Sequence, residues 1–215
     1  MVLPLIESVG TTTVSVADSD TSYTFPSVSF GTDHSSTEVI VIGVLQKVGG
    51  TNISSVTIDG NAATEIQNDA TGTSGDRVGA YLGQYAPPGG FASSGDIVVT
   101  LVGSAIGSDL SSLLVIWRLY NLRSTTVEDS AVNTTTPIDV NLTGISSGAV
   151  GVGITISDNN GTIAWTGLDE EFDVAIDTIG GRRGGASRAN LSSGGQTISA
   201  TTPSGAAIGI AAAWR

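Results

Sequence analysis

Length, composition and charge place the sequence among globular β-rich proteins and exclude several functions. Its 215 residues include 29 glycines, one histidine and no cysteine, and 20 acidic against 8 basic side chains give a net charge of −12. A chain of this size buries enough surface to fold without disulfides or metal, a thiol nucleophile is excluded, and the negative charge opposes binding to nucleic acid.

The first ten residues, MVLPLIESVG, are expected to form an extended N-terminal arm. They lack the basic region and the long apolar run of a signal peptide. No apolar stretch approaches the roughly 20 residues that a membrane span requires. We therefore expect a protein that folds in a cytoplasm without an export signal of its own and does not enter a membrane.

Alternating apolar and polar residues predict strands along the first half of the chain. Tyr23–Phe30 contains Pro26, which cannot donate to a ladder, so this strand is expected at an edge or with a bulge. Glu38–Gln46 is apolar on both faces, as in a central strand between two layers. Asp59-Gly60 separates two short runs within Ser55–Ile66 and predicts a tight hairpin.

Further segments are read in chain order from the same pattern. Residues 67–76 are polar and predict a loop. The segment 111–122, SSLLVIWRLYNL, fits a strand or a helix, and its β-branched and aromatic residues favour the strand. The other predicted strands lie at 11–16, 77–85, 96–102, 136–142, 163–166, 172–176 and 197–200.

Two strands near the C-terminus have one apolar face and one nearly bare face. In Gly148–Ser157, valine and isoleucine alternate with glycine, alanine and threonine, and Ala206–Trp214 repeats this arrangement. Glycine packs nothing inside a strand, so a row of small residues indicates the close approach of another backbone, sheet or subunit. We expect both strands in the interior.

Turn signals separate about a dozen strands, and no helical segment of useful length lies between them, which excludes a βαβ architecture. The sequence therefore predicts an all-β fold, a two-sheet antiparallel β-sandwich of jelly-roll type. No linker or shift of composition marks a boundary, so residues 1–215 are expected to form a single domain. No regular internal repeat is evident, which argues against a propeller or solenoid.

Candidate catalytic and metal-binding residues are few. His34 is the only histidine, so a Ser-His-Asp triad would have to use it, but no Gly-x-Ser-x-Gly elbow accompanies it. Zinc is disfavoured because only carboxylates remain to complete a site. Calcium needs oxygen ligands alone, and its candidate ligands are Asp158, Asn160, Asp169 and Glu171. A solvated loop explains the same residues, and no cofactor is expected.

Arginine and aromatic residues are the candidates for contact with a partner. Arg182, Arg183 and Arg188 cluster in the glycine-rich segment 179–190, where they could form a mobile loop or dock on an acidic surface. Trp165, Tyr81 and Tyr85 are candidate interface residues, and if exposed they would offer stacking platforms for sugar rings.

The succession VTIDGNAATEI, RVGAYLGQY, GDIVVTL, LLVIWRLYNL and AAIGIAAAW, between Ser55 and Arg215, resembles β-sandwich proteins encoded among the virion structural genes of tailed bacteriophages and prophages. The resemblance implies a non-enzymatic component of a virion, such as a capsid decoration (cement) or head-spike protein or a tail accessory. It also implies assembly in a bacterial cytoplasm and contact with the major capsid or tail protein. No site residue is carried over, because the likeness lies in the pattern of strands.

Three classes of function therefore stay open. A virion protein assembled as a homo-oligomer is favoured by the acidic, cysteine-free sandwich. A carbohydrate-binding module or tail-fibre receptor-binding domain that recognises a host surface glycan is the alternative. A glycoside hydrolase on a jelly-roll fold would require two carboxylates facing each other across an aromatic-lined cleft.

Overall fold

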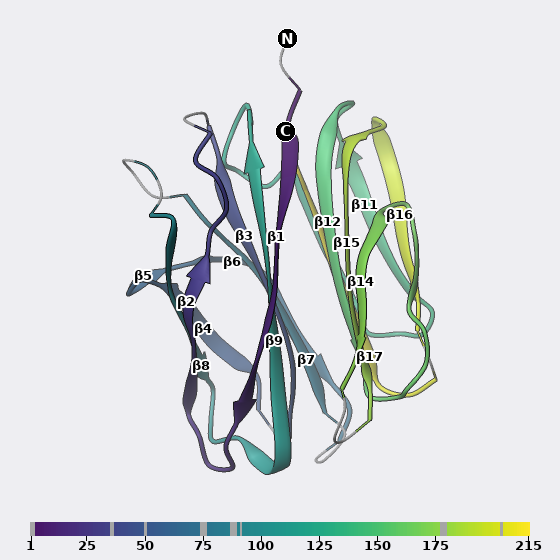
Figure 1. Cartoon of the computed structure of the whole chain (residues 1–215). Helices are drawn as coiled ribbons and strands as arrows, with labels where there is room; N and C mark the ends of the chain where they lie inside the picture. Colours follow the sequence, from purple (N-terminus) through teal and green to yellow (C-terminus); the bar gives the residue numbers. More distant parts are fainter. Residues whose placement is uncertain are drawn as a thin grey trace.

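The computed structural model describes residues 3–34, 37–49, 51–73, 77–86, 90, 92–176, 180–202 and 204–215. Within these ranges the chain consists of strands and connecting turns, and every strand pairing is antiparallel (Figure 1). The described residues contain no helix long and apolar enough to cross a membrane. The prediction of an all-β antiparallel fold is confirmed.

The described strands form four sheets, where the sequence pattern predicted two. Sheet A has the order β1 (Leu5–Val16), β9 (Ile106–Tyr120), β3 (Val39–Gly49), β7 (Val78–Tyr85), β6 (Thr64–Thr71). Sheet B has the order β2 (Ser22–Ser29), β8 (Ser94–Leu101), β4 (Ile53–Ile58), β5 (Asn61–Ala62). Both sheets come from the first part of the chain.

The second part of the chain supplies the other two sheets. Sheet C has the order β10 (Asp129–Asn133), β17 (Ala207–Trp214), β12 (Ala149–Ser157), β15 (Arg182–Leu191), β14 (Asp169–Ala175). Sheet D has the order β11 (Ile138–Ile145), β16 (Gly194–Thr201), β13 (Ala164–Thr166). We call sheets A and B the first sandwich, and sheets C and D the second.

Three apolar layers hold the four sheets in the order B, A, C, D. One layer joins sheets B and A, a second joins A and C, and a third joins C and D. In Figure 1 the purple-to-teal strands of the first sandwich stand beside the green-to-yellow strands of the second. We call the layer between sheets A and C the seam; the central strands of sheets A and C, such as β12 and β17, are therefore buried on both faces.

The seam explains why single strands did not reveal the number of sheets. Alternation shows which faces of a strand are covered but not which sheet covers them. In β3, Ile40 and Ile42 pack in the first sandwich, whereas Val41 and Leu45 pack in the seam. The jelly-roll form stays a prediction.

Several local predictions are confirmed. The strand that contains Pro26 is β2, which lies at the edge of sheet B and carries a bulge between Phe25 and Val28. β3 lies in the centre of sheet A. Asp59 and Gly60 both have positive φ, +48° and +76°, in the turn that joins β4 to β5.

The small residues of β12 and β17 lie under sheet D, as the bare strand faces predicted. Their bulky residues point into the seam, and Ala211 and Ala213 pack toward sheet D. A Cβ on Gly153 would stand 2.9 Å from the Trp165 ring and 3.0 Å from Leu168 Cδ1. A second sheet of the same chain therefore makes the close approach.

Other expectations are wrong. Residues 5–10, expected in an N-terminal arm, belong to β1 and pair with β9. The predicted loop 67–76 is a strand as far as Thr71, and residues 74–76 lie outside the described residues. The glycine-rich loop predicted at 179–190 is, from Arg182 on, strand β15 (Arg182–Leu191) between β12 and β14, and residue 179 lies outside the described residues. The polar and glycine-rich composition of these segments predicted loops. They form strands because their backbone groups bond to neighbouring strands, which does not depend on apolar side chains.

Candidate functional site

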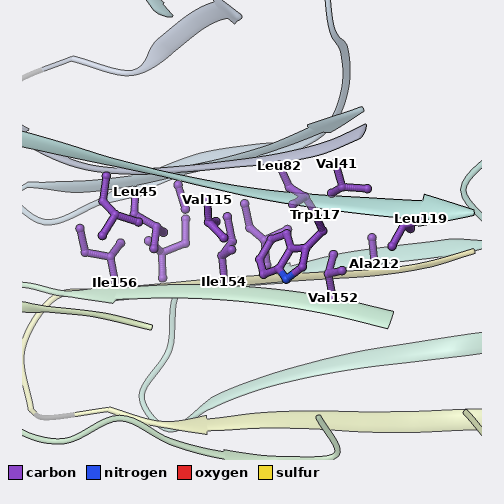
Figure 2. Close-up of a cluster of buried hydrophobic side chains, with 14 of the residues drawn as sticks. Val41, Leu45, Leu82, Val115, Trp117, Leu119, Val152, Ile154, Ile156 and Ala212 are labelled. Atoms are coloured by element: carbon purple, nitrogen blue, oxygen red, sulfur yellow. The ribbon is translucent and has the colours of Figure 1, made fainter. Parts of the chain in front are cut away.

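The seam brings polar and charged side chains of the two sandwiches into contact. Its centre is apolar, and Figure 2 shows Val41, Val115 and Trp117 from sheet A facing Val152 and Ile154 from sheet C. Polar and charged groups surround this centre and bond from one sandwich to the other. They include three of the residues that the sequence offered as calcium ligands or partner contacts.

Glu171 on β14 connects the second sandwich to the first. Its Oε2 accepts hydrogen bonds from Ser8 Oγ at 2.6 Å and from Trp117 Nε1 at 2.8 Å, and its Oε1 accepts one from Ser187 Oγ. Three donors therefore satisfy this candidate calcium ligand. A carboxylate engaged in this way holds two sandwiches together.

A lysine ammonium lies at the loop that contains Asp158 and Asn160. Lys47 is 3% exposed, and its Nζ donates to the backbone carbonyl oxygens of Asp158 at 3.4 Å and Gly180 at 3.2 Å. The Asn160 Oδ1 atom accepts from Gly181 N at 2.9 Å. The oxygen-rich loop predicted as a calcium site thus binds the ammonium group of Lys47, which extends from the first sandwich.

Asp169, the fourth calcium candidate, pairs with an arginine at the surface. Its carboxylate accepts from Arg188 Nη2 at 2.6 Å and from Arg188 Nε at 3.1 Å. The hydrogen bond from the guanidinium lowers the pKa of Asp169 and raises that of Arg188. Among the described residues, no group of three acidic or histidine side chains is placed to hold a metal ion.

The other two arginines of β15 also bond within the chain. Arg182 forms a two-pronged pair with Asp173, at 2.5 Å from Nε and 2.9 Å from Nη2. Arg183 is 2% exposed, points into the seam, and donates from Nη2 to the Ser111 carbonyl at 2.6 Å. Burial lowers its pKa to about 10, so the guanidinium stays charged at neutral pH. The structure therefore places the arginine cluster in a strand whose side chains tie neighbouring strands together.

The three aromatic candidates do not share a surface. Tyr81 is buried inside the first sandwich, where burial raises the pKa of its phenol, and Tyr85 packs partly buried against the same layer. Trp165 lies half-buried between sheets C and D, over Gly153 and Gly184. They do not form a common stacking platform for a sugar ring.

His34 stacks on Tyr120 and contacts Glu7. The ring centroids lie 3.7 Å apart at 12°, and Nε2 lies 3.2 Å from Glu7 Oε2. The same Glu7 oxygen accepts from the backbone N–H of Thr32 at 3.2 Å. These contacts fix the loop before β3 to strand β1.

A buried ion pair lies beside this histidine and was not predicted. Arg118, fully buried in β9, donates to both carboxylate oxygens of Glu38 at 2.9 and 2.8 Å. It also donates to the carbonyls of Phe30 and Gly31. The sequence signal for this ion pair was the arginine within the apolar run LLVIWRLY. A buried arginine is stable only when its charge is paired.

Two open hollows flank the connector between β9 and β10. One, of about 580 Å³, is lined by residues that include Arg123, Glu128 and Arg215, and the other, of about 410 Å³, by residues that include Glu65 and Gln84. None of the described residues that line them is a histidine or an aromatic residue. The Glu128 carboxylate accepts from the backbone N–H and the hydroxyl of Ser146 and is thus engaged in holding strand β10 to the end of β11.

Comparisons with protein-family models and with curated proteins give no match to this sequence. The functional conclusion therefore depends on the residues and contacts described above.

Proposed function

We propose that the protein is a non-enzymatic structural component of a tailed-phage virion, of the capsid decoration or cement kind. In this role it assembles as a homo-oligomer on the particle and contacts the major capsid or tail protein. The resemblance of its strand pattern to virion β-sandwich proteins suggests this role. The contacts of its polar groups support it.

One observation carries the proposal: the side chains that could do chemistry bond the sheets to each other. Glu171 joins β14 to β1 and β9, Lys47 joins β3 to the loop after β12, and Arg183 joins β15 to β9. Lys47 and Arg183 are almost fully buried, whereas catalytic groups need open access to a substrate. Groups engaged in this way stiffen a molecule instead, which suits a building block of a particle.

The outer faces of the four-layer stack are compatible with close packing against neighbours. Sheet B exposes Ser22 and Thr24, and sheet D exposes Asn141 and Thr197. Short polar side chains lose little rotamer freedom when a partner covers them. The single lysine of the sequence lies inside the molecule, so these faces carry no long flexible ammonium groups.

The strand order also supports a jelly-roll form for the first sandwich. Strands β1, β9, β3 and β7 of sheet A face strands β2, β8, β4 and β5 of sheet B. The chain passes back and forth between the two sheets, as in a double Greek key. Virion proteins and lectins both use this architecture, and the separated aromatic residues give the lectin-like alternative less support.

Deletion of the gene from the phage or prophage that carries it tests the proposal. We expect wild-type particles to contain the protein in many copies. Particles without it should lose surface density in electron micrographs and release DNA at lower temperature, and added purified protein should reverse both changes. Absence of the protein from purified wild-type particles, or unchanged particle surface and stability after deletion, would refute the proposed role.

A further inference from the structure

The two sandwiches have the same strand order. Sheet A runs β1-β9-β3-β7-β6, and sheet C runs β10-β17-β12-β15-β14. Sheet B runs β2-β8-β4, and sheet D runs β11-β16-β13, so that only the two-residue strand β5 has no counterpart. Each strand of the second sandwich thus occupies the place of a strand in the first, in the same chain order.

Two polar contacts at the rim of the seam join corresponding pairs of strands. On one side Gln67 of β6 donates to Ser130 Oγ of β10 at 3.1 Å. On the other side Ser8 of β1 donates to Glu171 of β14 at 2.6 Å. Because β1 corresponds to β10 and β6 to β14, the two contacts join the same pair of strands with the two sandwiches exchanged, although the donor lies on β6 in one and on β1 in the other. A two-fold interface has this property.

The two seam tryptophans lie on corresponding strands, β9 and β17, and their acceptors lie on strands that do not correspond, β14 and β7. Trp117 of β9 pairs across the ladder with Val41 of β3, and Trp214 of β17 pairs with Val150 of β12. Both indoles are fully buried. Trp117 Nε1 donates at 2.8 Å to Glu171 of the second sandwich, and Trp214 Nε1 donates at 2.7 Å to Gln84 of the first. Each sandwich therefore inserts one tryptophan that bonds to the other.

We infer that the chain is a covalently linked dimer of one repeated sandwich unit, and that the seam is the surface through which the two units recognise each other. The partner that each inner sheet fits is a second copy of the unit. The seam has the composition of a subunit interface, with an apolar centre, buried tryptophan anchors and a polar rim. The repeat was not evident in the sequence because it lies in the order of the strands, which alternation within a single strand does not reveal.

Cleavage of the connector in the folded protein tests this inference. A protease site inserted after Ser124, in the exposed part of the connector, allows the intact chain to fold before it is cut. We expect the two fragments to stay together as a one-to-one complex with the mass of the uncut chain in native mass spectrometry. Fragments that separate or aggregate after cleavage at micromolar concentration would overturn the inference.

The same substitution, tryptophan to phenylalanine, is made at three positions, and the third position serves as a matched control. Trp117→Phe and Trp214→Phe each remove one N–H donor from the seam, and each should weaken the association of the cut fragments about tenfold. Trp165→Phe changes a tryptophan outside the seam, whose Nε1 has no hydrogen-bond partner among the described residues, and should leave the association unchanged. An effect at only one of the two seam positions, or an equal effect at Trp165, would contradict a reciprocal seam.

Discussion

Lys47, the only lysine of the sequence, shows how single charged residues tie the layers together. Its stem leaves β3 in the first sandwich, and its ammonium reaches two carbonyl oxygens in the second. Burial of a charge is costly unless each donor and acceptor is satisfied. The ammonium therefore holds the loop after β12 in one position.

Replacement of this lysine tests its role. Lys47→Met keeps the length of the side chain but leaves the carbonyls of Asp158 and Gly180 short of a donor, so the free energy of unfolding should fall by about 1–3 kcal/mol. Urea unfolding measures the change. Arg188→Met, which breaks a solvent-exposed pair, is the control and should have little effect. An unchanged or more stable Lys47→Met protein would contradict a structural role for the ammonium.

The carboxyl group of Asp129 should make the stability of the fold depend on pH. Burial alone would raise its pKa, but hydrogen bonds from the backbone N–H groups of Gly144, Thr143 and Ser130 outweigh burial and lower it. A carboxyl whose pKa is lower in the folded than in the unfolded state stabilises the fold above its unfolded pKa. This stabilisation is lost as the pH falls through the folded pKa.

Asp129→Asn should therefore be less stable than the wild type at pH 7, and the difference should shrink as the pH falls from about 4 to about 2. Urea unfolding of both proteins across this range measures the difference. If the difference were the same at every pH, the charge on Asp129 would not be what stabilises the end of β11.

At the scale of strands, the sequence was informative where one residue decides the geometry. Asp59-Gly60 predicted the hairpin because both positions need positive φ, and Pro26 predicted an edge strand because it lacks an N–H. The bare face of β12 predicted a close neighbour. Strand β15 was missed because its glycines leave room for aromatic rings from other segments of the chain. No pattern within β15 predicts those rings.

The glycines of β15 lead to a test. A Cβ on Gly185 would overlap the Phe172 ring, so Gly185→Ala should lower the free energy of unfolding by about 1–3 kcal/mol. At Gly103 the nearest atom to an added Cβ is Thr51 Oγ1, 3.9 Å away, and Gly103→Ala should be nearly neutral. Chemical denaturation compares the two. Equal stability of both variants would mean that β15 does not need glycine for packing.

At the scale of the candidate site, residue types were predicted better than their roles. Asp158, Asn160, Asp169, Glu171 and the three arginines were chosen as charged or oxygen-rich residues, and the structure places all of them in contacts within the chain. Two of the partners across the seam, Lys47 for Asp158 and Ser8 for Glu171, lie more than 100 residues away. Spacing along the sequence carries no signal for contacts of this kind.

At the scale of the whole molecule, the seam should make two sandwiches behave as one cooperative unit. Sheets A and C bury one face in their own sandwich and the other in the seam. Opening of either sandwich therefore exposes the inner face of the other. We therefore expect that neither sandwich is stable without the other.

Native-state hydrogen exchange of the intact chain tests this most directly. The slowest amides should lie in β3 and β9 of the first sandwich and in β12 and β17 of the second, and all four strands should share the free energy of global unfolding. Exchange of one pair of strands through an opening of much lower free energy, while the other pair stays protected, would contradict a seam that joins the two sandwiches into one folding unit.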